Sequence, residues 1–243
     1  MSAGFTFLGS LFETPATREA YEPLLSAGVA ASVLCVSGYV ASQALKRATN
    51  PIVPDSTLSS RGLFDLAAEF LIQLGDDMMG KQNRKYLPFV GTVFLYILTM
   101  NLLGLVPGYA GPTANLAANV GIAAVVFVLY NAWGIKEVGP VAYFKHLLGP
   151  NMMIAPLFLL IELVSHCFRP ASLSLRLFGN MTGDHAAISV FTDLTKVGVP
   201  VPFYLLGTFV CFMQAYVFTL LTMVYIGGAV THEHDDEEHH DHH

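Results

Sequence analysis

The chain has 243 residues, of which 53% are hydrophobic and 12% are charged, and its formal net charge is −6. Soluble domains carry about 25% charged residues, so this composition excludes an ordinary soluble protein and indicates a polytopic membrane protein. The negative charge is local, because six acidic residues lie within 233–243. Cys35, Cys167 and Cys211 are odd in number, widely spaced and set in apolar runs, which indicates neither a disulfide framework nor a metal site.

Residues 1–23 contain several acidic residues and no basic stretch followed by an apolar run. We therefore expect an extracytoplasmic N-terminal segment rather than a cleaved signal peptide. Residues 24–230 form the predicted membrane domain, because crossing about 30 Å of hydrocarbon takes roughly 20 apolar residues as a helix. The predicted spans are 24–45, 86–107, 115–135, 152–192 and 200–229. The fold class is therefore all-α, with about five transmembrane helices.

A different pattern lies between the first two spans, at about 60–78. Asp65 and Glu69 fall on one side of a helix whose other positions are mostly apolar. This pattern is typical of an amphipathic helix that lies at the membrane interface.

Basic residues in the loops set the expected orientation. Six of them lie between the first and second spans: Lys46, Arg47, Arg61, Lys81, Arg84 and Lys85. Because positive charge is enriched in cytoplasmic loops, this loop should face the cytoplasm. The N-terminus is then outside and the C-terminus inside. The acidic, His-rich tail 231–243 is predicted to be cytoplasmic and disordered, with no metal site.

The fourth stretch is too long for an upright helix, since about 40 residues would reach some 60 Å. It is either steeply tilted or broken, and Pro170 offers a point for a kink. A rival division into spans 152–168 and 171–192 would place the C-terminus outside. The fifth stretch is also long, which favours two neighbouring tilted helices.

Arg176 lies deep in this fourth apolar stretch. Its guanidinium stays protonated, and placing such a group at the centre of a membrane helix costs roughly 2.5 to 3.5 kcal/mol. An ionisable residue at this depth usually marks a site that faces a polar partner or a water-filled cavity. The sequence thus indicates a protein that moves ions.

Residues seven positions apart on a helix differ by only about 20° in direction, so Glu162, Arg169 and Arg176 share one stripe, with Asn180 one turn further on. His185 is nine positions beyond Arg176 and should point to the opposite side of the helix.

The residues around Arg176 resemble the signature of subunit a of the F-type ATP synthase, the stator half of its proton channel. The resemblance covers about residues 60–228 and rests on several motifs in order: Met100–Gly108, Pro112–Leu116, Pro170–Met181 with His185, Gln214–Phe218 and Leu221–Tyr225. It implies an interfacial helix and two long, tilted C-terminal helices that pack against a rotating ring of c subunits.

By this resemblance, Arg176 faces the carboxylate of a ring subunit. A positive charge a few ångströms away lowers a carboxyl pKa by about 1 to 3 units, so each passing acid would release its proton. A permanent cation also repels hydronium, which would prevent a leak between the two access channels. Lysine would serve poorly, because it deprotonates when buried.

The resemblance also implies roles for other polar residues. Glu162 matches an acid in the cytoplasmic half-channel, while Asn180, His185 and Gln214 match positions in the outer half-channel. An imidazole relays protons near neutral pH. Some family members carry a second ionisable residue on the last helix, where this chain has Gly207, and Asp184 offers a substitute. A further group is either channel-lining or structural: Asn101, Asn115, Ser172, Arg169 and Tyr225.

No GxxxxGK[ST] phosphate loop occurs in the chain, so we expect a non-catalytic subunit without cofactors. Its expected partners are the c ring, peripheral-stalk b subunits, the remaining ATP synthase subunits and the lipid bilayer, with no nucleic acid. A bacterial plasma membrane is the preferred location and an organellar inner membrane the alternative. Two rival hypotheses are a stand-alone ion-coupled secondary transporter, although no internal repeat is visible, and a haem-binding electron carrier.

Overall fold

The computed structural model describes residues 15–47, 60–80, 83–107, 109, 111–140, 143, 155–194 and 200–230. Its elements are α1 (Pro15–Arg47), α2 (Ser60–Met79), α3 (Asn83–Gly104), the 3-10 turn η3 (Pro112–Ala114), α4 (Leu116–Val138), α6 (Ala155–Leu194) and α7 (Pro200–Val230). These described ranges contain no strand, and the predicted all-α class is confirmed. Our expectations for residues 1–14 and for the tail 231–243 lie outside the described residues.

Four described helices are long and apolar enough to cross a membrane. The candidate spans are Tyr21–Gln43, Arg84–Gly104, Leu116–Val138 and Val201–Val230, on α1, α3, α4 and α7. They confirm a polytopic membrane protein. Helix α6 is the longest of the described helices, with 40 residues, yet it is not among these four. Its charged residues, such as Arg169, Arg176 and Asp184, interrupt every long apolar run, so a fifth span on α6 stays a prediction.

Helix α6 continues without a break through Pro170. The rival division of this stretch into two short spans required an interruption here, and there is none. Proline provides no backbone N–H, which removes one hydrogen bond from the helix. The Ser174 hydroxyl donates to the Pro170 carbonyl at 2.8 Å and to that of Ala171 at 3.0 Å, and both contacts stay within the helix.

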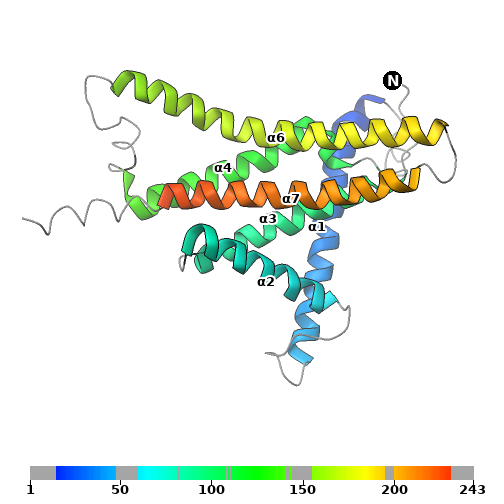
Figure 1. Ribbon diagram of the computed structural model, residues 1–243, viewed down its shortest axis with the longest axis horizontal. Helices are drawn as coiled ribbons and strands as arrows, with labels where there is room; N and C mark the ends of the chain where they lie inside the picture. Colours follow the sequence, from blue (N-terminus) through cyan, green and yellow to red (C-terminus); the bar gives the residue numbers. More distant parts are fainter. Residues whose placement is uncertain are drawn as a thin grey trace, which may run out of the picture.

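Figure 1 shows α6 and α7 as two long ribbons that lie close together at one end and diverge toward the N-terminal end of α6, while α1 crosses their direction steeply. Helices α3 and α4 lie behind this pair and contact α7. Helix α1 carries the first candidate membrane span. Because α1 crosses the direction of α6 and α7 steeply, these two helices are strongly inclined to a helix that can cross the membrane.

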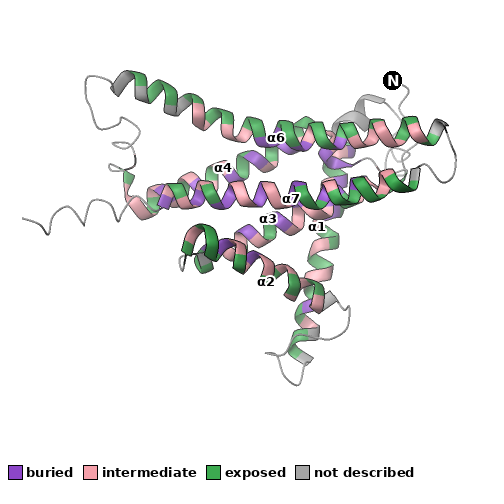
Figure 2. Cartoon of the chain, viewed as in Figure 1, coloured by how far each residue is buried: buried purple, intermediate pink, exposed green. Residues whose placement is uncertain are grey.

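The core lies where α3, α4 and α7 meet, with α2 and α6 packed against it. Its largest buried side chains include Tyr86, Ile97, Tyr130 and Phe218, each at most 2% exposed. Figure 2 shows buried residues gathered on α3, α4 and α7, whereas much of α6 and α1 is exposed. In a membrane, packing and interhelical hydrogen bonds hold helices together, so this core fixes the position of α7 and, through it, of α6.

Candidate functional site

Three side-chain contacts join α6 and α7 along their length. The Arg169 guanidinium lies 5.2 Å from the centre of the Tyr225 ring. Eleven residues further along α6, the Asn180 amide nitrogen donates to the Gln214 side-chain oxygen at 2.6 Å. After another eleven residues, the rings of Phe191 and Phe203 stack with their centres 3.9 Å apart.

These three contacts recur every eleven residues on both helices, and the two helices run antiparallel. Eleven residues make three turns, about 16 Å, and bring the side chain back to nearly the same direction. One side of α6 therefore faces α7 over most of its length. Arg176 lies between the first two of these contacts along α6. The two contacts therefore fix the position of Arg176 along α7.

Arg176 itself is exposed, although its neighbours Leu173 and Leu177 are only 2% and 1% exposed. It has no ion-pair partner among the described residues. A cation of this kind at membrane depth needs a polar or anionic partner. None of the described residues supplies such a partner for Arg176.

The exposed part of α6 around Arg176 combines small side chains with the large apolar residues Phe168 and Leu175. Gly179 and Gly183 have open space where a Cβ atom would stand, with no atom within 4 Å. Ala171 and Ser172 are exposed on the same helix, and the Ser172 hydroxyl donates to the Arg169 carbonyl at 3.1 Å, within the helix. Small residues let two helix backbones approach closely in a membrane, so this face is shaped for another helix.

Buried polar groups lie on the other side of α6. His185 points away from Arg176, as predicted from their spacing, and its Nε2 atom is buried, only 3.6 Å from where a Cβ on Gly111 would stand. Asp184 is half-buried and interacts electrostatically with His185. A Cβ on Gly111 would lie 2.9 Å from the Gly104 Cα and 2.8 Å from Met181 Cε, so glycine at this position lets η3 and the end of α3 approach each other closely.

Gly207 packs against the end of α3. It is buried, and a Cβ atom there would come within 2.8 Å of Leu105 Cδ2. A larger ionisable side chain would first have to displace Leu105. The space at Gly207 is thus occupied by the Leu105 side chain.

Several further buried polar atoms have no hydrogen-bond partner among the described residues. They include Gln214 Nε2, Asn101 Nδ2, Thr113 Oγ1 and Asn119 Oδ1, on residues that are at most 5% exposed. Most buried polar groups in proteins are hydrogen-bonded to protein or to ordered water. Asn119 does use its amide nitrogen, which donates to the Thr113 carbonyl at 2.7 Å. These residues lie on α3, η3, α4 and α7, which pack on one another in part, and α4, η3 and α7 also pack on α6.

Asn101 was predicted from the sequence as a candidate site residue, whereas Thr113 and Asn119 were not. Thr113 belongs to the Pro112–Leu116 motif, and Asn119 lies one helical turn after Asn115, so both were visible as polar residues in an apolar context. Asn115 instead caps α4: its side-chain oxygen accepts from the backbone N–H groups of Ala117 at 2.8 Å and Ala118 at 3.4 Å.

An aromatic group surrounds Arg169 toward the N-terminal half of α6. The Tyr225 ring, which Arg169 contacts, lies 5.8 Å from the Tyr130 ring, and Tyr130 lies 6.2 Å from the His166 ring. The Glu162 side chain, which the sequence places on the same stripe as Arg169, lies outside the described residues.

Together the fold and the site define a polytopic α-helical membrane protein in which side-chain contacts join α6 to α7. Its Arg176 is exposed and has no ion-pair partner among the described residues, and buried polar groups lie nearby. Residues 24–227 match the family model described as ATP synthase A chain, and the chain belongs to this family. The resemblance inferred from the motifs is thereby confirmed.

Named relatives agree with this assignment. The chain is 44% identical over 220 residues to "ATP synthase subunit a" of Bdellovibrio bacteriovorus, covering 90% of this chain and 96% of the relative. It is 45% identical over 172 residues to the protein of the same name from Sulfurihydrogenibium sp., covering 71% and 83% of the two chains. A relative from Campylobacter jejuni subsp. doylei is 42% identical over 181 residues, covering 72% and 80%.

Proposed function

We propose that this protein is the stator subunit of the membrane sector of an ATP synthase, where it couples proton movement to rotation of a ring of c subunits. Family membership supports the membrane-sector role. One observation supports the finer proposal: Arg176 is exposed on α6 with no ion-pair partner among the described residues, and it lies between two side-chain contacts that fix its position along α7. The rival hypotheses of a stand-alone transporter and a haem carrier have no comparable support.

Arg176 acts electrostatically on the acid that each ring subunit carries past it. An opposite charge within about 4 to 6 Å stabilises the ionised carboxylate and lowers its pKa by about 1 to 3 units. The ring acid therefore gives up its proton as it reaches Arg176 and is reprotonated only after it has moved on. The permanent charge of Arg176 also excludes hydronium from the gap between the two access paths.

The outer access path runs through the polar side of α6. It uses the buried cluster that includes Asn101 and His185, with Asp184 beside the imidazole, and reaches Arg176 past the Asn180–Gln214 pair. Neutral imidazole accepts a proton on one nitrogen and donates from the other, which suits a relay near neutral pH.

The inner access path lies toward the N-terminal half of α6 and uses Glu162. This residue precedes Arg176 by fourteen positions, about 21 Å along the helix, whereas Asn180 follows it by one turn. The two paths are thus offset along the helix on either side of the arginine. A ring acid must rotate to pass from one path to the other, and this requirement converts a proton gradient into torque.

In the assembled enzyme the exposed face of α6 and α7 packs on the c ring, and other surfaces meet the peripheral-stalk b subunits and the bilayer. Nucleotide chemistry belongs to the remaining subunits. The protein lies in a bacterial plasma membrane with its N-terminus outside and its C-terminus in the cytoplasm. Helix α2 lies along the cytoplasmic interface.

Substitution of Arg176 tests the proposal. In membrane vesicles that contain the assembled enzyme, Arg176→Ala should lower proton-driven ATP synthesis by at least about 100-fold, which corresponds to roughly 2.7 kcal/mol. Arg176→Lys should be nearly as inactive, because a buried ammonium loses its proton. The matched control is Val190→Ala, an exposed residue of the same helix, which should retain normal rates. Normal synthesis by an assembled Arg176→Ala enzyme would refute the proposed role.

A further inference from the structure

Met181 fills a notch between the end of α3 and the residue that precedes η3. It lies on α6 and is 3% exposed. Its terminal methyl carbon, Cε, occupies the place where a side chain at Gly104 would begin, and it would lie 2.8 Å from a Cβ on Gly111. The two glycines are themselves close, since a Cβ on Gly104 would lie 3.3 Å from the Gly111 Cα. The methionine side chain therefore reaches from α6 to the point where two glycine backbones meet.

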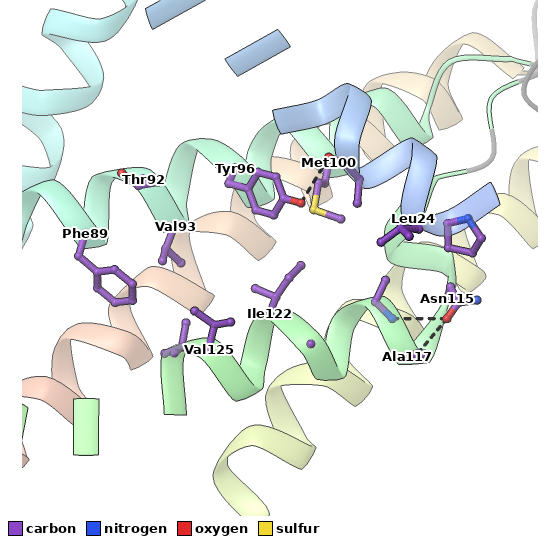
Figure 3. A pocket seen from close by; sticks show the side chains of 15 residues that line it. Leu24, Phe89, Thr92, Val93, Tyr96, Met100, Asn115, Ala117, Ile122 and Val125 are labelled. Carbon is purple, nitrogen blue, oxygen red and sulfur yellow. Dashed lines mark hydrogen bonds between the residues drawn. The ribbon is translucent and has the colours of Figure 1, made fainter. Parts of the chain in front are cut away.

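The turn that follows Gly111 holds this notch in place. The Ala114 N–H donates to the Gly111 carbonyl at 3.0 Å. The Asn115 side chain then accepts from the Ala117 N–H at 2.8 Å, which caps α4 (Figure 3). Because both bonds are local, η3 and the start of α4 form one unit, and the notch beside Gly111 has a fixed shape.

His185 lies against the same two glycines. It follows Met181 by four positions, so the two side chains are neighbours on one face of α6. Its Nε2 atom is 3.6 Å from the Gly111 Cβ position, which is also 2.8 Å from the Met181 methyl carbon. The imidazole interacts with the Gly104 backbone as well. Met181 therefore limits the positions that the imidazole can adopt beside Gly111.

The direction of the imidazole matters because of its Nε2 atom. This atom is buried and has no hydrogen-bond partner among the described residues. Buried polar atoms of this kind are usually satisfied by ordered water. A relay through His185 requires Nε2 to keep facing such a water, and a ring that turned away would interrupt the path.

We propose that Met181 is a positioning residue for the outer proton path: packed on Gly104 and Gly111, it holds the His185 imidazole in the orientation that the relay needs. This inference rests on the proposed function, because Met181 acts through His185. Methionine suits the task, since its unbranched side chain fits irregular gaps and its thioether does not titrate. Leucine has a similar volume and usually replaces methionine in packed sites at little cost.

The pH dependence of proton-driven ATP synthesis tests this role, measured on the intact enzyme in vesicles and expressed per assembled complex. The imidazole titrates beside Asp184, which also interacts electrostatically with Cys211 on α7, so a displaced ring should change its protonation. Met181→Ala should lower the rate at least about fivefold and move the pH of half-maximal rate by about 0.5 unit or more. Met181→Leu should keep the wild-type pH profile and a rate within about twofold of wild type.

Met223→Ala is the matched control. Met223 is also fully buried, but it belongs to the hydrophobic core on α7. A loss of packing alone lowers the rate equally at every pH, so this variant should keep the wild-type pH profile. Gly104→Ala is a second test that creates no cavity, because its Cβ displaces the Met181 methyl group without removing the side chain. It should shift the pH profile as Met181→Ala does.

His185→Gln separates this inference from the proposed function. If this variant keeps the wild-type rate and pH profile, the outer path does not use the imidazole, and both the path and the role of Met181 are wrong. If His185→Gln changes them while assembled Met181→Ala or Gly104→Ala does not, only the role of Met181 is overturned. An equal shift in Met223→Ala would also overturn it, because the shift would then reflect packing in general.

Discussion

The substitution Gly179→Leu tests whether the exposed face of α6 packs on a rotor. It should leave the stability of this chain unchanged or raise it, but it should lower the activity of the assembled enzyme. A Cβ atom at Gly179 meets nothing within 4 Å. Leucine is a better helix former than glycine by up to about 1 kcal/mol, so Gly179→Leu should leave the subunit as stable as before or slightly more stable. Any loss of function must then arise outside this chain.

In the assembled enzyme the leucine side chain would stand between α6 and the rotor, three residues from Arg176. Overpacking of a close interface costs about 1 to 3 kcal/mol, which corresponds to a roughly 5- to 150-fold loss of coupled activity. Proton-driven ATP synthesis in vesicles measures this loss, and the thermal stability of the purified complex provides the comparison. Gly28→Leu is the control, since Gly28 also has open space but lies on α1. Normal synthesis by Gly179→Leu would mean that no rotor packs on this face.

Three further substitutions address the supports of the site. Gly111→Ala should lower the free energy of unfolding by about 1 to 3 kcal/mol, because its Cβ would lie 2.9 Å from the Gly104 Cα; calorimetry should show no such loss for Gly121→Ala. Gln214→Leu removes the 2.6 Å hydrogen bond with Asn180 and should reduce proton flux through the membrane sector by about tenfold or more; flux equal to wild type would exclude this pair from the outer path. Arg169→Leu loses its contact with Tyr225, worth about 0.5 to 2 kcal/mol, so the complex should melt earlier while proton-driven synthesis persists; complete inactivity would indicate a second essential cation.

The sequence predicted the helices well because their signal is local. Apolar runs of adequate length mark α1, α3, α4 and α7, and the amphipathic stretch near Asp65 became α2. The opposite directions of Arg176 and His185 followed from helix periodicity alone. Helix α6 was harder to interpret, since its polar residues weaken the hydrophobic signal and Pro170 suggested a break that the helix does not have.

The tertiary contacts could not be predicted in the same way. The pairing of Phe191 with Phe203 depends on the register of α6 against α7. No single position in the sequence specifies that register. Gly207 looked like a missing ionisable partner, but its close packing on Leu105 is visible only when α7 is placed against the end of α3.

The central claim is that Arg176 faces an acid on the rotor. An electron cryomicroscopy map of the assembled membrane sector would test it most directly, through the distance between the Arg176 guanidinium and the nearest rotor carboxylate. We predict a separation of about 4 to 6 Å or less in at least one rotational state. A guanidinium directed at lipid head groups or bulk water, with every rotor acid well beyond this range, would contradict the account.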